Sequence, residues 1–267
     1  MEVACDLAHP GRRRGKLARV RDRGIFYLVL GIFCLASLVW SLLAGVLFRL
    51  LPRRAGATLG QFVIMAGFRA GLGLMRLGGL ARFDLGALDA LPAQGPAVIA
   101  CNHLSLLDAV LVISRLPNAV CIAKAGLWDN PFLGGSVRLA GYIRNDAPLA
   151  LIRAASRALR EGRQLVIFPE GTRSDGRGLG RFKPGFAAMA RAAGVPVQTV
   201  FLHSNTPYLR RGWVLHRMPD FPLAYRARCG RRIAVSGDVR AASDGMERYF
   251  ADELSRAELS RAELSRA

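Results

Sequence analysis

A single uncharged run near the N-terminus limits the folds open to this chain. From Ile25 to Phe48 the sequence reads IFYLVLGIFCLASLVWSLLAGVLF, 24 residues without a charged side chain. As a helix, this run would be about 36 Å long, which is enough to cross the hydrocarbon core of a bilayer. It is too long for the apolar core of a cleaved signal peptide, and no convincing cleavage site accompanies it. We therefore expect a retained membrane segment.

Positive charge and a second apolar stretch flank this run. Residues 59–80 are apolar but contain Arg69 and Arg76, which lie seven apart and so share one helical face. This pattern suits an amphipathic helix at the membrane interface, and equally a helix packed on a soluble domain. We assign residues 25–80 to membrane-associated helices and residues 1–24 to a basic leader. The basic residues of the leader are Arg12, Arg13, Arg14, Lys16, Arg19, Arg21 and Arg23, opposed by Glu2, Asp6 and Asp22.

After residue 80 short apolar runs alternate with helical patterns, which predicts an α/β domain over residues 81–242. Its sheet should be mixed and mostly parallel, with flanking helices. The expected strands are 96–102, 119–123, 141–144, 164–169 and 195–202, with a late strand or two in 226–238, and the expected helices lie near 105–115, 127–139, 147–161 and 184–193.

Composition narrows the class of partner. The net charge of +19, from 38 Lys and Arg against 19 Asp and Glu, favours anionic partners, and the apolar N-terminus makes anionic membrane lipids the expected ones. The arginines of the soluble part are dispersed without interleaved aromatic residues, so we expect no nucleic-acid partner. The five scattered cysteines indicate neither a disulfide framework nor a zinc site. Residues 243–267, with Glu-Leu-Ser-Arg-Ala three times in tandem, are expected to form a helical or disordered tail.

The first candidate for chemistry is the segment CNHLSLLDAV, in which His103 and Asp108 follow an apolar strand. Imidazole accepts protons near neutral pH, and a carboxylate beside it orients the ring and stabilises the imidazolium. The chain has no Gly-x-Ser-x-Gly nucleophile elbow, so the substrate would supply the nucleophile. Two structural readings stay open: Ser105-x-x-Asp108 is also a capping-box pattern, and His103 could be a hydrogen-bonded structural histidine.

The second candidate is QLVIFPEGTRS, residues 164–174, a buried strand that breaks at Pro169 into a polar turn. Gly171 allows unusual backbone angles and close approach to a ligand, and Arg173 offers a planar fork of donors suited to phosphate. The alternative is a strand-end turn that contains an internal ion pair between Glu170 and Arg173.

The two candidates together resemble the glycerolipid acyltransferase family, which includes bacterial 1-acylglycerol-3-phosphate acyltransferases. NHLSLLD (102–108) and FPEGTRS (168–174) occur in the family's order, about sixty residues apart. Residues 123–146 and 195–202 resemble two further family motifs, so that the resemblance covers roughly residues 80–205.

The resemblance implies His103 as the general base and Asp108 as the residue that orients it. It implies binding of the acceptor's glycerol phosphate by the turn after the second strand and by two further basic residues: Glu170, Gly171, Thr172, Arg173, Lys124 and Arg144. The implied acyl donor is acyl-CoA or acyl-carrier protein, with no metal and no cofactor. In the family one spacer residue commonly separates the isoleucine and arginine of the second motif, whereas here Arg144 follows Ile143 directly.

These implications predict an enzyme that acylates a lysophospholipid, with 1-acyl-sn-glycerol 3-phosphate as the expected acceptor. Another lyso-lipid such as lyso-ornithine lipid, a specialised acceptor and a thioesterase remain alternatives, and a non-enzymatic basic membrane protein fits less well. Because such donors are cytosolic, the catalytic domain is expected on the cytoplasmic face of the inner membrane. The basic leader belongs on the same side, which requires the two apolar segments to form a hairpin-like pair.

Overall fold

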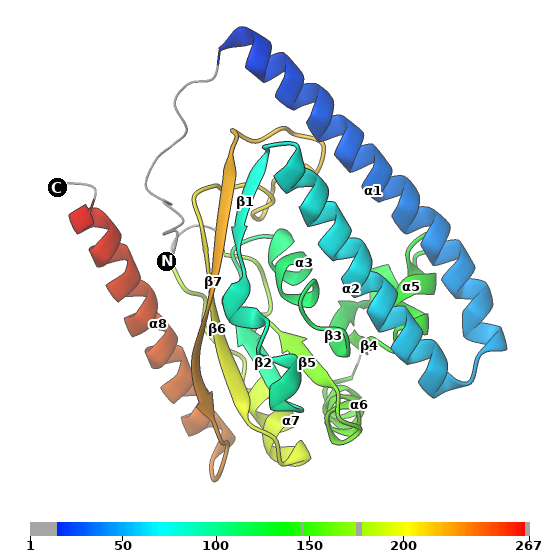
Figure 1. Cartoon of the computed structure of the whole chain (residues 1–267). Coiled ribbons are helices and arrows are strands. Elements are labelled where there is room, and N and C mark those ends of the chain that lie inside the picture. The colour runs from blue at the N-terminus through cyan, green and yellow to red at the C-terminus, as the bar shows by residue number, and fades with distance from the viewer. Residues whose placement is uncertain (1–14, 146, 175–177, 265–267) are drawn as a thin grey trace.

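Two long N-terminal helices lie along one side of a sheet in the computed structural model, which describes residues 15–145, 147–174 and 178–264 (Figure 1). Helix α1 spans Lys16–Leu50 and contains the uncharged run, and α2 spans Arg53–Leu77. The second helix starts six residues earlier than expected, because Pro52 caps it and Arg53 and Arg54 form its first turn. The expected pair of helices is therefore present. Most of the predicted basic leader, residues 1–14, lies outside the described residues.

The sheet has seven strands in the order β1-β7-β6-β2-β5-β3-β4. Every neighbouring pair is parallel except β6 and β7, so the predicted mixed and mostly parallel sheet is confirmed. The strands span Ala81–Asp84 (β1), Val98–Cys101 (β2), Ala119–Lys124 (β3), Ile143–Asn145 (β4), Gln164–Ile167 (β5), Val197–Ser204 (β6) and Leu223–Ile233 (β7).

Three details differ from expectation. Strand β1 was not expected, because four residues give too little periodicity to read. The helix expected at 127–139 is two short helices, separated by a turn that contains Pro131. The tail is helical and begins at Val239, and residues 265–267 lie outside the described part of the chain. The helices after α2 span Leu107–Ile113 (α3), Ala125–Trp128 (α4), Gly134–Leu139 (α5), Pro148–Arg160 (α6), Gly185–Ala193 (α7) and Val239–Leu264 (α8).

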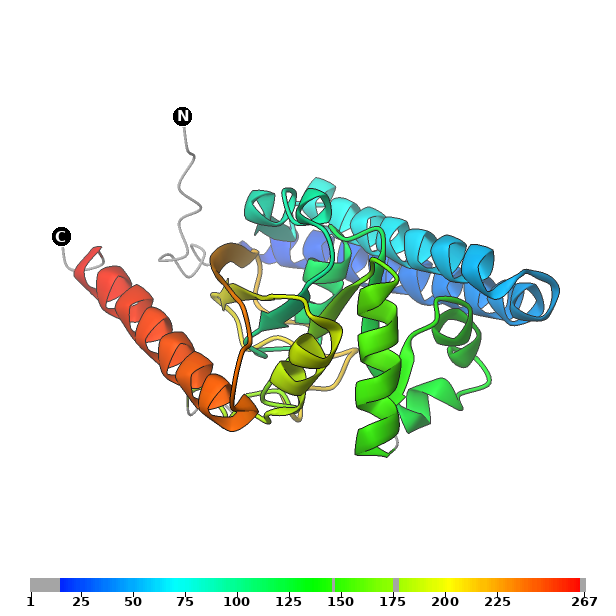
Figure 2. The same cartoon turned by 90° about the horizontal axis from the view of Figure 1, so that it is seen from below.

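The strand residues alternate between two cores. Ile99, Cys101 and Leu202 pack with α2 and α3, whereas Val98 and Ala100 pack with α6 and α7. Figure 2 shows the resulting layers, with α1 and α2 on one side of the sheet and α6 and α7 on the other. The apolar helix pair therefore covers one face of the α/β domain and is part of its fold.

Close backbone approach fixes α1 and α2 to α5. A Cβ atom on Gly135 would lie 1.9 Å from the carbonyl oxygen of Ser41, and one on Gly60 would lie 2.7 Å from the backbone nitrogen of Ala140. The backbone N–H of Ser136 also donates to the Ser41 hydroxyl at 3.3 Å. Side chains larger than hydrogen would push these elements apart. The orientation of the apolar helices relative to the sheet is thus set by backbone contact.

Candidate active site

The candidate residues lie on the same side of the sheet, at the carboxyl ends of four parallel strands. His103 follows β2, and the turn from Phe168 to Arg173 follows β5, the strand beside β2. Lys124 ends β3 and Arg144 lies in β4, two and three strands away from β2. At about 4.8 Å per strand these positions are about 10 and 14 Å from the β2 end. Sheet order therefore brings the two main motifs together and places the two outer basic residues at a distance.

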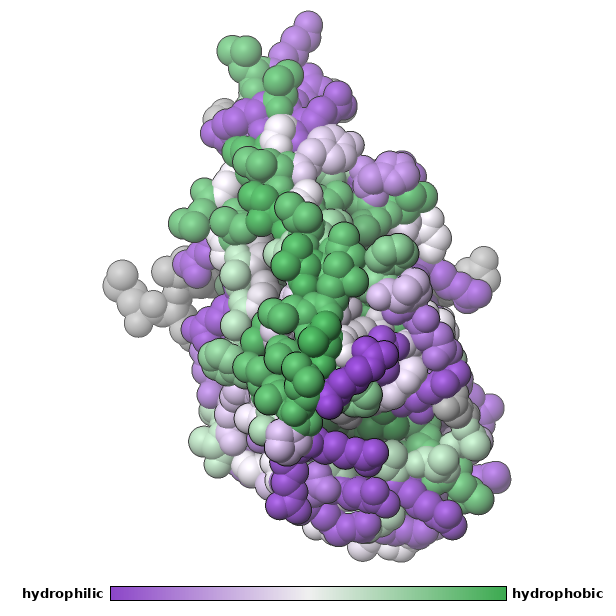
Figure 3. All heavy atoms as spheres, turned by 90° about the vertical axis from the view of Figure 1, so that its right-hand side faces the viewer, coloured by the Kyte–Doolittle hydropathy of each residue, from purple (hydrophilic) through white to green (hydrophobic). Residues whose placement is uncertain are grey.

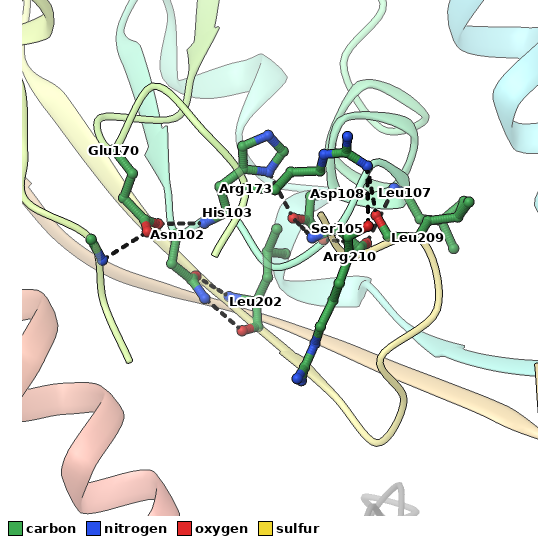
Figure 4. A network of polar contacts seen from close by, with 11 residues as sticks. Asn102, His103, Ser105, Leu107, Asp108, Glu170, Arg173, Leu202, Leu209 and Arg210 are labelled. Carbon is green, nitrogen blue, oxygen red and sulfur yellow. Dashed lines mark hydrogen bonds and ion pairs between the residues drawn. The ribbon is translucent and has the colours of Figure 1, made fainter. Parts of the chain in front are cut away.

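The imidazole of His103 is held by the carboxylate of Asp108. His103 Nδ1 lies 3.0 Å from Asp108 Oδ2 (Figure 4). The His103 ring also stacks on Phe168, with ring centroids 4.0 Å apart. With the Nδ1 proton donated to the carboxylate, the lone pair of Nε2 is left to accept a proton. The His103 side chain is 16% exposed. This geometry is that of an oriented general base.

Asp108 is both the partner of His103 and the acceptor of hydrogen bonds from Ser105 in the turn before α3. It is completely buried, and it accepts hydrogen bonds from the Ser105 backbone N–H at 2.6 Å and from the Ser105 hydroxyl at 3.0 Å. The Ser105 hydroxyl in turn accepts from the backbone N–H of Leu107 at 3.2 Å. Three donors on one buried carboxylate compensate for its lost hydration. The expected pairing of Asp108 with His103 is present, whereas the N-cap position of α3 is occupied by Leu106, which has no side-chain cap.

The backbone of His103 is fixed from the opposite side by Glu170. Its Oε1 accepts from the His103 N–H at 2.7 Å and its Oε2 accepts from the Gly180 N–H at 2.8 Å (Figure 4). The carbonyl of His103 accepts from the Ser174 N–H at 2.7 Å. Burial raises the pKa of Glu170, and the hydrogen bonds from the His103 and Gly180 N–H groups partly oppose that rise. Hydrogen bonds to the main chain of His103 therefore join the two motifs, residues 102–108 and 168–174.

Arg173 points away from Glu170, so the internal ion pair considered above is not what holds this turn. Arg173 Nη1 donates to the carbonyl oxygen of Leu209 at 2.9 Å and approaches that of Arg210 at 3.4 Å. Gly171 has a φ of +70°, and the side chain of Lys183 lies so close that a Cβ on Gly171 would be 2.9 Å from Nζ. Thr172 is exposed at the tip of the turn. The turn thus carries one fixed guanidinium and one neighbouring ammonium.

The two outer basic residues are exposed. Arg144 pairs with Asp129, Nη2 to Oδ2 at 2.8 Å, and its side chain is 39% exposed. Lys124 is also exposed, at the end of β3. Their distance from the β2 end follows from strand order and leaves them on the rim of the site.

Three contributors were not anticipated. Asn102 binds the backbone of Leu202 through both ends of its amide, at 2.9 and 2.7 Å, and so continues the pairing of β2 with β6. Phe168 supports the imidazole ring, and Lys183 faces the turn. A polar amide directly after a buried strand was a usable signal for Asn102. Nothing local marks Phe168 or Lys183, since both act across long stretches of sequence.

An apolar cavity adjoins the site. Its volume is about 130 Å³, and it is lined by α1, α2, the start of α3 and the loop between β6 and β7. Leu209 belongs both to this lining and to the carbonyl pair that holds Arg173. The first motif also borders the cavity, because Leu106 and Leu107 are part of its lining.

Several known proteins are similar to this chain in sequence. The acyltransferase family model matches residues 82–203. The 1-acyl-sn-glycerol-3-phosphate acyltransferase of Pseudomonas aeruginosa is 29% identical over 195 residues, which cover 71% of this chain and 73% of that protein. A chloroplastic 1-acyl-sn-glycerol-3-phosphate acyltransferase of Brassica napus is 33% identical over 126 residues, or 45% of this chain and 36% of that protein.

The fold is matched over a longer stretch. The crystal structure of the 1-acyl-sn-glycerophosphate acyltransferase of Thermotoga maritima superposes with a TM-score of 0.64 at 19% identity, covering 89% of this chain and 98% of that one. The region matched by the family model, residues 82–203, contains both motifs. Residues 82–203 therefore form an acyltransferase domain, and the similar proteins indicate an O-acyltransferase of the glycerolipid acyltransferase type.

Proposed function

We propose that this enzyme transfers a fatty acyl group from acyl-CoA or acyl-carrier protein to the free hydroxyl of 1-acyl-sn-glycerol 3-phosphate, giving phosphatidic acid. The observation that carries the proposal is the pairing of His103 Nδ1 with the buried Asp108 carboxylate, beside a turn that presents Arg173. The names of the similar proteins support the choice of acceptor.

In the proposed reaction His103 acts as base and then as acid. Its Nε2 removes the proton from the acceptor hydroxyl while that oxygen attacks the thioester carbonyl, and Asp108 stabilises the imidazolium. The tetrahedral intermediate then collapses, the carbon–sulfur bond breaks, and Nε2 returns the proton to the departing thiolate. The new ester carries the acyl group and the enzyme regains its starting protonation.

Direct transfer to the acceptor, without an acyl-enzyme, fits the state of the nearby serine. Ser105 is 2% exposed, its hydroxyl donates to Asp108, and its oxygen accepts from the Leu107 N–H. A hydroxyl committed in this way is a poor nucleophile, because attack would break the network that orients His103. The acceptor hydroxyl is therefore the attacking group in our proposal.

The acceptor phosphate is assigned to the basic side of the turn. Arg173 keeps donors beyond the Nη1 that it gives to Leu209 and Arg210, and Lys183 lies across Gly171, with Thr172 at the tip. Lys124 and Arg144 would contact a longer or branched head group from the rim. Glu170 supports this set indirectly, because both of its oxygens are taken by backbone N–H groups. The apolar cavity would accommodate part of an acyl chain, since it resembles in size an engineered cavity of about 150 Å³ that binds benzene.

Membrane association is supported by the two helices, which are both long and apolar enough to cross a bilayer. Figure 3 shows a continuous apolar band bordered by hydrophilic surface on the side of the molecule where α1 lies. We propose that α1 and α2 lie in the cytoplasmic leaflet of the inner membrane, with Arg49, Arg53 and Arg54 held at an anionic lipid surface. A full crossing by these charges would cost roughly 2.5–3.5 kcal/mol each at the bilayer centre. Cysteine labelling at positions 20, 54 and 90 tests this, and exclusive labelling of position 90 from outside the cell would contradict it.

The reaction is tested by product analysis. The enzyme is incubated with radiolabelled acyl-CoA or acyl-carrier protein, with and without 1-acyl-sn-glycerol 3-phosphate, and products are separated. Labelled phosphatidic acid that forms only with acceptor supports the proposal. Labelled free fatty acid released at the same rate with and without acceptor would identify a thioesterase instead.

A further inference from the structure

The loop between β6 and β7, residues 205–222, joins three parts of the molecule. Tyr208, Leu209 and Leu215 line the apolar cavity together with α1 and α2. The carbonyls of Leu209 and Arg210 hold Arg173. On the other side, the Tyr27 hydroxyl of α1 donates to the His216 carbonyl at 3.2 Å. The same loop therefore contacts the proposed phosphate site, the cavity and the apolar helix.

The tip of this loop has the composition of a membrane-interface segment. Residues 210–217 read Arg-Arg-Gly-Trp-Val-Leu-His-Arg, and Val214 and Leu215 are 51% and 46% exposed. The indole Nε1 of Trp213 donates to the Arg217 carbonyl at 3.0 Å, and the Arg217 guanidinium lies 4.8 Å from the indole ring. Tryptophan favours the depth of the lipid head groups, and arginine binds lipid phosphates. Exposed apolar side chains with arginines close by on both sides fit a lipid bilayer, whose interior is apolar and whose surface carries anionic phosphates.

The loop extends the apolar face of α1. Tyr27, which bonds to His216, lies on the same helix as the exposed residues Leu28 and Ile32. Continuity with this face and the net charge of +19 favour an anionic bilayer over a protein partner. A helix alone can roll about its long axis at an interface. A second line of contact, made by a loop tied to that helix, prevents rolling.

We propose that the tip from Trp213 to Leu215 inserts into the head-group layer of an anionic bilayer and fixes the rotation of the enzyme about α1. The acceptor then enters the cavity between α1 and this loop, with its phosphate passing toward Arg173. The insertion stands independently of the reaction, and the route of the acceptor rests on the proposed function.

Tryptophan fluorescence tests insertion directly. The chain has three tryptophans, so Trp40→Phe and Trp128→Phe leave Trp213 as the only emitter. The full-length protein is mixed with vesicles of phosphatidylcholine and phosphatidylglycerol that carry brominated acyl chains. A blue shift of emission, quenching by bromine near the head groups and protection from acrylamide are expected. Emission that keeps its wavelength and its acrylamide quenching while the protein sediments with vesicles would overturn the proposal.

The route of the acceptor is tested with Val214→Glu and the matched variant Leu149→Glu. Leu149 is 69% exposed on α6, a helix that packs on the other face of the sheet. Val214→Glu should raise the KM for acceptor in anionic vesicles about fivefold, because it adds a like charge at the surface. Its kcat with a short-chain, water-soluble acceptor should be unchanged, and Leu149→Glu should change neither value. Equal effects of the two variants on the vesicle KM would contradict the route. If wild-type enzyme acylates neither acceptor, the proposed function fails, and the fluorescence result alone decides insertion.

Discussion

The end of strand β2 and the outward face of α1 differ in which side chains they bury and which they expose. At the β2 end, the carboxylates of Asp108 and Glu170 are buried and each accepts hydrogen bonds from within the chain. On α1, apolar side chains such as Leu28 and Leu35, both 63% exposed, are left mostly uncovered by the described part of the chain. The first region is organised in advance and needs only substrate. The second becomes favourable only when a bilayer covers it. Mutations at the β2 end should therefore change the reaction rate, and mutations on the outward face of α1 should change membrane binding.

The sharpest separation is expected from His103→Ala. Loss of a general base lowers the rate by roughly 10²–10⁴-fold, and membrane binding should be unchanged. The turnover number, the melting temperature and sedimentation with vesicles are measured on the same preparation. A folded variant with near-normal turnover would refute the assigned role of His103.

Asp108→Asn should lower the turnover number by roughly 10²-fold or more, because an amide nitrogen cannot accept the hydrogen bonds of Ser105 and His103. It should also cost about 1 kcal/mol or more of stability, through weakening of the hydrogen bonds that Ser105 donates to the carboxylate. Denaturant unfolding read beside kinetics checks both effects. A loss of activity without any loss of stability would mean that the bonds between Asp108 and Ser105 contribute nothing to stability.

On the other region, Leu35→Glu should lower partitioning into anionic vesicles roughly tenfold. Removing a leucine from an apolar phase forfeits about 1.5 kcal/mol or more. The turnover number with a water-soluble acceptor should be unchanged, since Leu35 lies outside the cavity lining. Leu149→Glu, a matched change on the other face of the sheet, is the control and should partition like the wild-type enzyme. If Leu35→Glu partitions equally well, α1 does not face lipid.

The smallest effect concerns Arg173→Lys. We expect a rise of a few-fold in the acceptor KM with little change in the donor KM, because an ammonium cannot reproduce the guanidinium fork. Initial rates are measured with each substrate varied in turn. A rise in the donor KM alone would assign the phosphate contact to the donor.

Local sequence patterns were sufficient to predict the helices, strands and contacts that depend on residues close together in the sequence. The uncharged run predicted α1, and the short apolar runs predicted β2, β3, β5 and β6 within a few residues. His103 and Asp108 could be paired because they lie five residues apart on a strand-to-helix turn. Contacts across long separations left no local mark. Examples are the bonds from Glu170 to the His103 backbone and from Arg173 to Leu209, which depend on strand order.

The β6–β7 loop illustrates the same limit. Its residues form neither strand nor helix, and its sequence has no periodicity to interpret. Its importance follows from placement, because folding brings Leu209 to Arg173 and His216 to Tyr27.

Direct attack by the acceptor on the thioester is the central claim, and a rapid-quench experiment without acceptor tests it. Enzyme at high concentration is mixed with radiolabelled acyl donor, quenched in acid within milliseconds to minutes, and the protein is counted after delipidation. Our account predicts that no label becomes bound to protein and that labelled phosphatidic acid appears only when 1-acyl-sn-glycerol 3-phosphate is added. Labelled protein that forms in proportion to enzyme, maps to Ser105 and passes its label to added acceptor would contradict it.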